Sequence, residues 1–152
     1  MIVTFCGHSD FTWSGEIEKR IMEILEERVG DSPAQFYLGG YGGFDGFAHA
    51  CCKKYQKTHP KTELILITPY LDDRYLKRRL EYEKDAYDEI LYPPIENAPL
   101  KYAISHRNKW MVEQSDLVVA YVTHSWGGAS QTLQHAKRKR KEIVNLSESN
   151  YL

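Results

Sequence analysis

The sequence of 152 residues is 42% hydrophobic and 27% charged, and its formal net charge is −1. This length and composition suit a single globular domain spanning residues 1–152, with enough interior for a sizeable core. The near-neutral charge argues against a basic footprint for nucleic acid over the whole protein, and no apolar run approaches the roughly 18 residues of a membrane span. We therefore expect neither a membrane nor a nucleic acid as partner.

The three cysteines, Cys6, Cys51 and Cys52, are odd in number and lack the spacing of a zinc motif. Reduced thiols in a cytoplasmic protein are the simplest interpretation. Met1–Cys6 reads as a strand rather than a signal peptide, because no basic segment and no long apolar stretch accompany it.

The first half of the chain alternates strands with helices. The apolar run Ile2–Cys6 predicts a buried strand, and Ser14 can cap a helix that extends over Gly15–Gly30. Gln35–Leu38 predicts a second strand, and the glycine-rich turn Gly39–Gly46 follows it. The spacing of apolar residues after this turn predicts another helix.

The middle of the chain is less regular. Leu64–Thr68 predicts a strand that is covered on both faces, because its apolar run is continuous. The charged, tyrosine-rich segment Asp72–Asp88 predicts a helix or a partly ordered excursion. Glu89–Tyr92 predicts a short strand, and Tyr102–Gln114 predicts a helix.

The C-terminal part holds the clearest strand, Leu117–Val122, and a helix that opens at Gly127 and Gly128 and extends to about Lys141. Ile143–Leu146 predicts a final strand. This alternation predicts an α/β, Rossmann-like three-layer fold with a mostly parallel sheet and helices on both faces. Such sheets bind ligands outside the carboxyl ends of their strands.

Three turns lie at that edge: Gly7–Ser9, Gly39–Gly46 and Thr123–Ser130. A glycine turn that opens a helix directs free N–H groups at an anion, and the helix dipole adds to the attraction. Glycines also serve tight strand-to-helix turns, but two such turns in one short domain favour a phosphate site. Neither the dinucleotide fingerprint nor a P-loop is present.

Side chains near these turns supply further candidates. Arg107 borders the apolar stripe of its predicted helix, so it either pairs with a carboxylate or reaches a phosphate. Asp45 could accept from a ribose hydroxyl, act as a catalytic base, or only cap the following helix. His8 and His124 could donate to a ligand, and Trp126 could stack on a base or pack against its turn.

Asp45 is the candidate catalytic residue. The candidate ligand-binding residues are Gly7, His8, Ser9, Gly39, Gly40, Gly42, Gly43, Asp45, Pro69, Arg107, Asn108, Thr123, Trp126, Gly127, Gly128, Ser130 and Thr132. No histidine has the spacing of a metal ligand, so we expect no metal and no other cofactor.

The segments Tyr37–Ala48, Arg107–Met111, Ser115–Val122 and Gly127–Gly128 together resemble the SLOG superfamily. That group includes the Lonely Guy phosphoribohydrolases, the DNA-processing protein A domain and the YpsA-like proteins. The resemblance implies a Rossmann-like domain that binds nucleotides or nucleotide-derived ligands, and it suggests self-association into a homo-oligomer.

The resemblance also has departures. In the Lonely Guy enzymes a second glycine motif, Pro-Gly-Gly-x-Gly-Thr-x-x-Glu, carries the catalytic glutamate, and Gln134 stands at that position here. Trp126, Ser130 and Gln131 replace the motif's proline, third glycine and threonine. A glutamine cannot act as a carboxylate base. The chain therefore looks closer to the YpsA-like, binding-type branch.

Three functions follow from these features. The first is a standalone sensor or carrier of a nucleotide-derived phosphorylated ligand. The second is hydrolysis of the N-glycosidic bond of nucleoside 5′-monophosphates, with Asp45 in place of the missing glutamate. The third is an association with nucleic acid through the basic run Lys137–Lys141, which overall charge disfavours.

Overall fold

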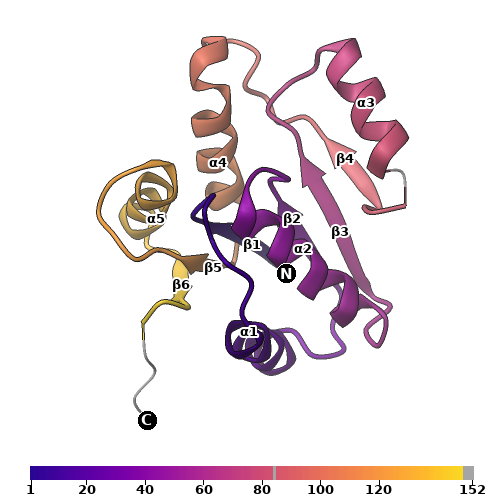
Figure 1. The fold of residues 1–152 in the computed structure, drawn as a ribbon, viewed down its shortest axis with the longest axis vertical. Helices are drawn as coiled ribbons and strands as arrows, with labels where there is room; N and C mark the ends of the chain where they lie inside the picture. Colours follow the sequence, from indigo (N-terminus) through magenta and orange to yellow (C-terminus); the bar gives the residue numbers. More distant parts are fainter. Residues whose placement is uncertain (84, 149–152) are drawn as a thin grey trace.

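The protein is a six-stranded, entirely parallel sheet with helices on both faces (Figure 1). The structure, a computed structural model, describes residues 1–83 and 85–148. The strands are β1 (Ile2–Gly7), β2 (Ala34–Leu38), β3 (Thr62–Ile67), β4 (Glu89–Leu91), β5 (Leu117–Tyr121) and β6 (Glu142–Asn145). The helices are α1 (Gly15–Arg28), α2 (Gly43–Gln56), α3 (Asp73–Glu83), α4 (Ala103–Gln114) and α5 (Gly128–Arg138), and a 3-10 turn, Leu100–Tyr102, precedes α4. The predicted fold class is confirmed.

The strand order is β4-β3-β2-β1-β5-β6. The chain builds outward from β1 to β4, then crosses back to place β5 on the other side of β1. The connections after β1 and β5 therefore leave the sheet toward opposite faces. This reversal creates a crevice at the carboxyl ends of β1 and β5, where open parallel sheets bind their ligands.

Side chains of β1 alternate between the two faces, as strand geometry requires. Val3 and Phe5 pack in the core beneath α1 and α2, together with Ile21 and Phe44. Cys6 lies in a separate cluster with residues of β5, α4 and α5. Figure 1 shows α1 and α2 close together, with α4 and α5 in a different part of the molecule.

The segment expected to be a helix or an excursion contains α3. Its described side chains, from Asp73 to Arg78, are exposed or half-buried. The described side chains of this helix therefore add little to the core. Within the described ranges, none of the helices has the length and apolarity that a bilayer crossing requires.

Candidate functional site

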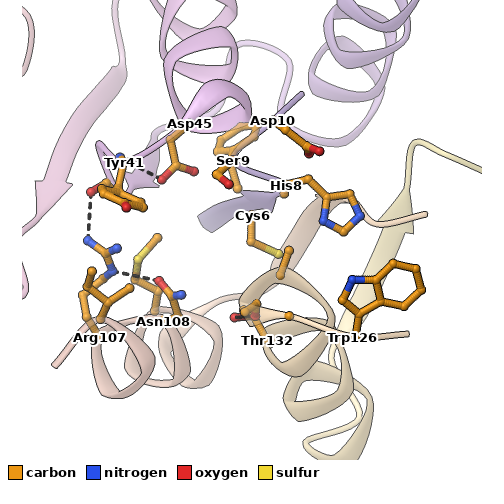
Figure 2. Close-up of a pocket in the computed structure, with 18 of the residues that line it drawn as sticks. Cys6, His8, Ser9, Asp10, Tyr41, Asp45, Arg107, Asn108, Trp126 and Thr132 are labelled. Carbon is orange, nitrogen blue, oxygen red and sulfur yellow. Dashed lines mark hydrogen bonds between the residues drawn. The ribbon is translucent and has the colours of Figure 1, made fainter. Parts of the chain in front are cut away.

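A cavity of about 390 Å³ lies in the crevice at the carboxyl ends of β1 and β5 (Figure 2). The loop after β1, the glycine turn after β2, the inner side of α4 and the turn before α5 enclose it. Its lining residues are Phe5, Cys6, Gly7, His8, Ser9, Asp10, Gly39, Tyr41, Asp45, Ile104, Arg107, Asn108, Met111, His124, Trp126, Gly127, Gly128, Ala129 and Thr132. Segments more than 120 positions apart in sequence, from Phe5 to Thr132, therefore meet at one site.

Most of the candidate ligand-binding residues line this cavity, and their role in binding remains a prediction. The cavity brings together Gly7, His8, Ser9, Gly39, Asp45, Arg107, Asn108, Trp126, Gly127, Gly128 and Thr132. It leaves out Gly40, Gly42, Gly43, Pro69, Thr123 and Ser130. Pro69 and Ser130 are buried, whereas Thr123 is exposed at the end of β5.

The two glycine turns end in N-cap glycines of the same backbone conformation. Gly42, the N-cap of α2, has φ 89° and ψ 177°, and Gly127, the N-cap of α5, has φ 91° and ψ 176°. This conformation is open only to glycine in practice, which explains a glycine at each position. The turns differ in what lies against them.

The turn before α2 is filled by the chain itself. The amide of Gly43 donates to the carbonyl of Ser9 at 2.7 Å, and the amide of Phe44 donates to the carbonyl of His8 at 3.2 Å. A Cβ on Gly43 would lie 2.6 Å from the carbonyl oxygen of Phe11. Gly42 and Gly43 therefore allow close packing of two backbones, which is why they lie outside the cavity.

The turn before α5 is open. Within the described part of the chain, the amides of Gly128, Ala129 and Ser130 donate to no other group, and the helix ladder starts with Gln131 donating to Gly127. A Cβ on Gly128 would meet nothing within 4 Å. The amides of Gly128 and Ala129, which line the cavity, and the positive end of a helix dipole are therefore available to a ligand there.

Arg107 connects two strand ends from its buried position on α4. Its side chain is 1% exposed, and its Nη1 donates to the carbonyls of Gly39 and Ile67, each at 2.8 Å. Its Nε donates to Oδ1 of Asn108 at 2.8 Å. The arginine thus satisfies the carbonyls at the ends of β2 and β3, a role that the sequence did not indicate.

Asp45 lies close to Arg107 across Gly39. A Cβ on Gly39 would lie 2.8 Å from Oδ2 of Asp45 and 3.2 Å from Nη2 of Arg107, so a larger residue there would require these charged groups to shift. Oδ2 of Asp45 also accepts from the amide of Tyr41 at 3.0 Å. The carboxylate therefore offsets the charge of the guanidinium on this side of the cavity.

Histidine and tryptophan rings form the opposite side. Figure 2 shows His8 and Trp126 across the pocket from Arg107. His8 stacks on His124, and His124 stacks on Trp126. Nε2 of His8 accepts from the amide of Thr123 at 2.9 Å. Burial, followed by the neighbouring His124, lowers the pKa of His8 below 6.5, against a smaller opposite effect of Asp10.

Cys6 is the only thiol among the lining residues, and it is protonated at neutral pH. Burial, with a smaller contribution from Asp45, raises its pKa to about 12. A thiol in that state is not a nucleophile. The described residues contain no group of three or more histidine, cysteine and carboxylate side chains that could hold a metal ion.

The candidate list omits several lining residues: Phe5, Cys6, Asp10, Tyr41, Ile104, Met111 and Ala129. His124, which the sequence offered as a donor without placing it on that list, also lines the cavity. Asp10 and Tyr41 adjoin predicted residues and could have been included for that reason. Gln134, at the position of the Lonely Guy glutamate, is exposed on α5 and does not line the cavity. The Lonely Guy carboxylate therefore has no counterpart in this pocket at that position.

Comparisons with known proteins give no match to a protein-family model. The uncharacterised SPbeta prophage-derived protein YoqJ of Bacillus subtilis is 26% identical over 141 residues, which span 81% of each chain. UPF0398 protein BH1768 of Halalkalibacterium halodurans is 27% identical over 134 residues, which span 82% of this chain and 67% of the relative.

DNA processing protein A of Streptococcus pneumoniae superposes with a TM-score of 0.61 at 18% identity, over 93% of this chain and 48% of that one. The chain shares the Rossmann-like α/β fold of this protein. The protein TM1055 superposes with a TM-score of 0.58 at 11% identity, over 93% of this chain and 71% of its own. DNA processing protein A of Helicobacter pylori superposes with a TM-score of 0.58 at 19% sequence identity, over 94% of this chain and 63% of that one. The Rossmann-like fold that the resemblance implied is confirmed, and these neighbours are consistent with a SLOG-type domain.

One expectation from the sequence is wrong. The net charge of −1 led us to set nucleic acid aside as a partner. The Helicobacter pylori structure with the same SLOG-type fold concerns the mode in which that protein binds single-stranded DNA. Overall charge therefore does not exclude nucleic acid as a partner of a protein with this fold, because a local groove can bind a strand even when the protein is nearly neutral overall.

Proposed function

We propose that this SLOG-type domain binds a nucleotide-derived ligand by its phosphate, at the N-terminus of α5. The observation that carries the proposal is the contrast between two glycine turns whose N-cap glycines have the same conformation. The amides at the start of α2 are occupied by the carbonyls of Ser9 and His8, whereas those of Gly128 and Ala129 border the cavity without a partner in the described chain.

The backbone amides, rather than Arg107, are proposed to contribute most of the phosphate affinity. The guanidinium already donates to two carbonyls and lies beside Asp45. A phosphate at a helix N-terminus receives several N–H donors and a favourable dipole without needing a cation. The side-chain amide of Asn108, on the inner side of α4, borders the same space.

Asp45 is proposed to accept from a hydroxyl of the sugar. Its carboxylate lines the cavity on the side opposite His8 and Trp126, so a ligand whose phosphate lies at Gly128 would extend between these sides. Carboxylates are suited to this contact because each oxygen accepts and none donates when ionised.

A thermal-shift panel tests the proposal, comparing nucleoside 5′-monophosphates with the matching nucleosides and with inorganic phosphate. We expect stabilisation by the monophosphates and little by the nucleosides. The absence of stabilisation by every phosphorylated compound would refute it. Chromatography of the same mixtures detects released base, and release that disappears in Asp45→Asn would instead support a glycosidic hydrolase.

We propose single-stranded DNA as a second candidate ligand, supported by the Helicobacter pylori neighbour and by an adjoining cavity of about 130 Å³ between α4 and α5. The two cavities share Asn108, Gly128 and Thr132, so a strand could continue from one into the other. Lys109 lines the second cavity and has no ion-pair partner in the described chain. A second phosphate could pair with it.

Fluorescence anisotropy with a labelled oligodeoxythymidine tests this second candidate. Lys109→Ala should weaken binding and reduce the slope of the logarithm of the binding constant against the logarithm of the salt concentration by about 0.7. Lys137→Ala, in the exposed basic run at the far end of α5, is the matched control and should change little. An equal effect of the two substitutions would place the strand elsewhere.

A further inference from the structure

Three aromatic rings form a stacked column on one side of the cavity. The ring centroids of His8 and His124 lie 4.0 Å apart with planes inclined by 16°, and those of His124 and Trp126 lie 3.8 Å apart at 17°. His8, at one end, is 8% exposed, whereas Trp126, at the other, is 69% exposed. A further flat ring could therefore extend the column only at Trp126.

The inner end of the column is fixed by the fold. Nε2 of His8 accepts from the amide of Thr123 at 2.9 Å, and the edge of His8 meets Tyr121 with ring centroids 6.4 Å apart at 89°. His124 lies between two rings and follows Thr123 directly. The column is thus ordered before any ligand arrives, which reduces the entropic cost of stacking a further ring on it.

The outer end of the column adjoins the proposed phosphate site. Trp126 directly precedes Gly127, the N-cap of α5, so the indole and the free amides of Gly128 and Ala129 belong to one turn. One face of the indole is covered by His124, and the large exposed fraction of Trp126 leaves the other face accessible. A large aromatic side chain with one face uncovered offers a flat surface on which a second ring can stack.

We infer that Trp126 is a stacking platform for the heteroaromatic base of the ligand whose phosphate binds at α5. This inference rests on the proposed function. Stacking requires no hydrogen-bond readout of the base edge, so the platform accepts any base and favours purines, whose ring surface is larger.

Calorimetric titration with adenosine 5′-monophosphate and with ribose 5-phosphate tests the platform. The two compounds share the phosphate and sugar, so their difference in affinity reports the base. We expect the wild-type protein to bind the nucleotide more tightly than ribose 5-phosphate. Trp126→Ala should weaken nucleotide binding roughly 5- to 100-fold, as for the loss of one base stack. Ribose 5-phosphate should bind both proteins equally, and Trp126→Phe should retain most of the affinity.

Trp13→Ala is the matched control. Trp13 is 64% exposed, close to the exposure of Trp126, but it contacts Phe47 and lies outside the cavity. We expect this variant to bind both compounds as the wild type does. Equal wild-type affinities for nucleotide and ribose 5-phosphate, or equal losses of both in Trp126→Ala, would overturn the platform and leave the phosphate site intact. Failure of both compounds to bind would overturn the proposed function, and the platform with it.

The base could belong to a free nucleotide or to a single strand, and oligodeoxythymidine separates these sources. If the strand is the ligand, Trp126→Ala weakens the binding of the oligonucleotide and Trp126→Phe restores it. If the free nucleotide is the ligand, the substitution affects the mononucleotide alone. Either pattern supports stacking on Trp126, and an effect on neither ligand overturns it.

Discussion

Adding one methyl group to each of two equivalent glycines should separate the filled turn from the open turn. Gly43 and Gly128 are each the first residue of a helix, after an N-cap glycine of the same conformation. A Cβ on Gly43 would lie 2.6 Å from the carbonyl oxygen of Phe11 and 2.8 Å from that of Ser9. A Cβ on Gly128 would meet nothing within 4 Å.

The magnitudes follow from these contacts. In Gly43→Ala the loop of Ser9 and Phe11 must move by roughly 0.8 Å to reach an ordinary 3.4 Å contact, which costs about 1–3 kcal/mol of overpacking. The shift also weakens the hydrogen bond from the Gly43 amide to Ser9, worth about 1 kcal/mol. For a domain of this size the sum lowers the Tm by roughly 5–15 °C. Gly128→Ala incurs no clash and restricts the unfolded chain, so its Tm should rise by about 1–3 °C.

Scanning calorimetry of the two variants and the wild type at one pH measures these shifts. Nucleotide affinity supplies a second readout, because the new methyl group of Gly128→Ala enters the cavity where the phosphate is proposed to bind. That variant should therefore bind more weakly while folding at least as stably. Equal losses of Tm at the two glycines, or no loss in Gly43→Ala, would refute the distinction between filled and open turns.

Two further predictions concern stability. Arg107→Met should leave the carbonyls of Gly39 and Ile67 without their donor, at about 1–3 kcal/mol each, and should lower the Tm by roughly 5–25 °C in calorimetry. An unchanged Tm would contradict the connecting role of the guanidinium. His8 has a lowered pKa in the folded state, so the unfolded chain takes up its proton first as the pH falls, and stability should decrease below about pH 6.5. Urea unfolding at pH values between about 7.5 and 5.5 should show this decrease in the free energy of unfolding of the wild type, and a smaller decrease in His8→Gln. Equal decreases in the two proteins would exclude His8, whose ring accepts from the amide of Thr123, as the cause.

The fold was predictable because its elements depend on local patterns. The apolar run around Leu117–Val122 and the helical spacing after Gly15 each identify an element without reference to distant residues, and β5 and α1 lie there. The parallel sheet then follows from alternation alone. The central position of β1 in the sheet needed the structure, since strand order depends on long-range pairing.

The site was predictable in location but not in the role of each residue. Gly43 and Gly128 look equivalent in the sequence, and only the fold shows that Ser9 covers one of them. The partners of Arg107 are carbonyls on distant strands, which a sequence motif cannot specify. The stack of His8 on His124 likewise depends on β1 and β5 pairing in register, Gly7 opposite Tyr121.

The most direct test of phosphate binding by the amides of α5 is to remove one of them. Proline is favoured at the first position of a helix, so Gly128→Pro should retain the fold and its Tm while eliminating one N–H donor. Calorimetric titration with a nucleoside 5′-monophosphate should then show affinity reduced roughly 10- to 100-fold from that of Gly128→Ala, which also has a side chain at this position but keeps its N–H, as expected for a lost hydrogen bond to a charged group. Binding of equal strength in the two proteins, or equal binding of the nucleoside and its monophosphate by the wild type, would contradict the account.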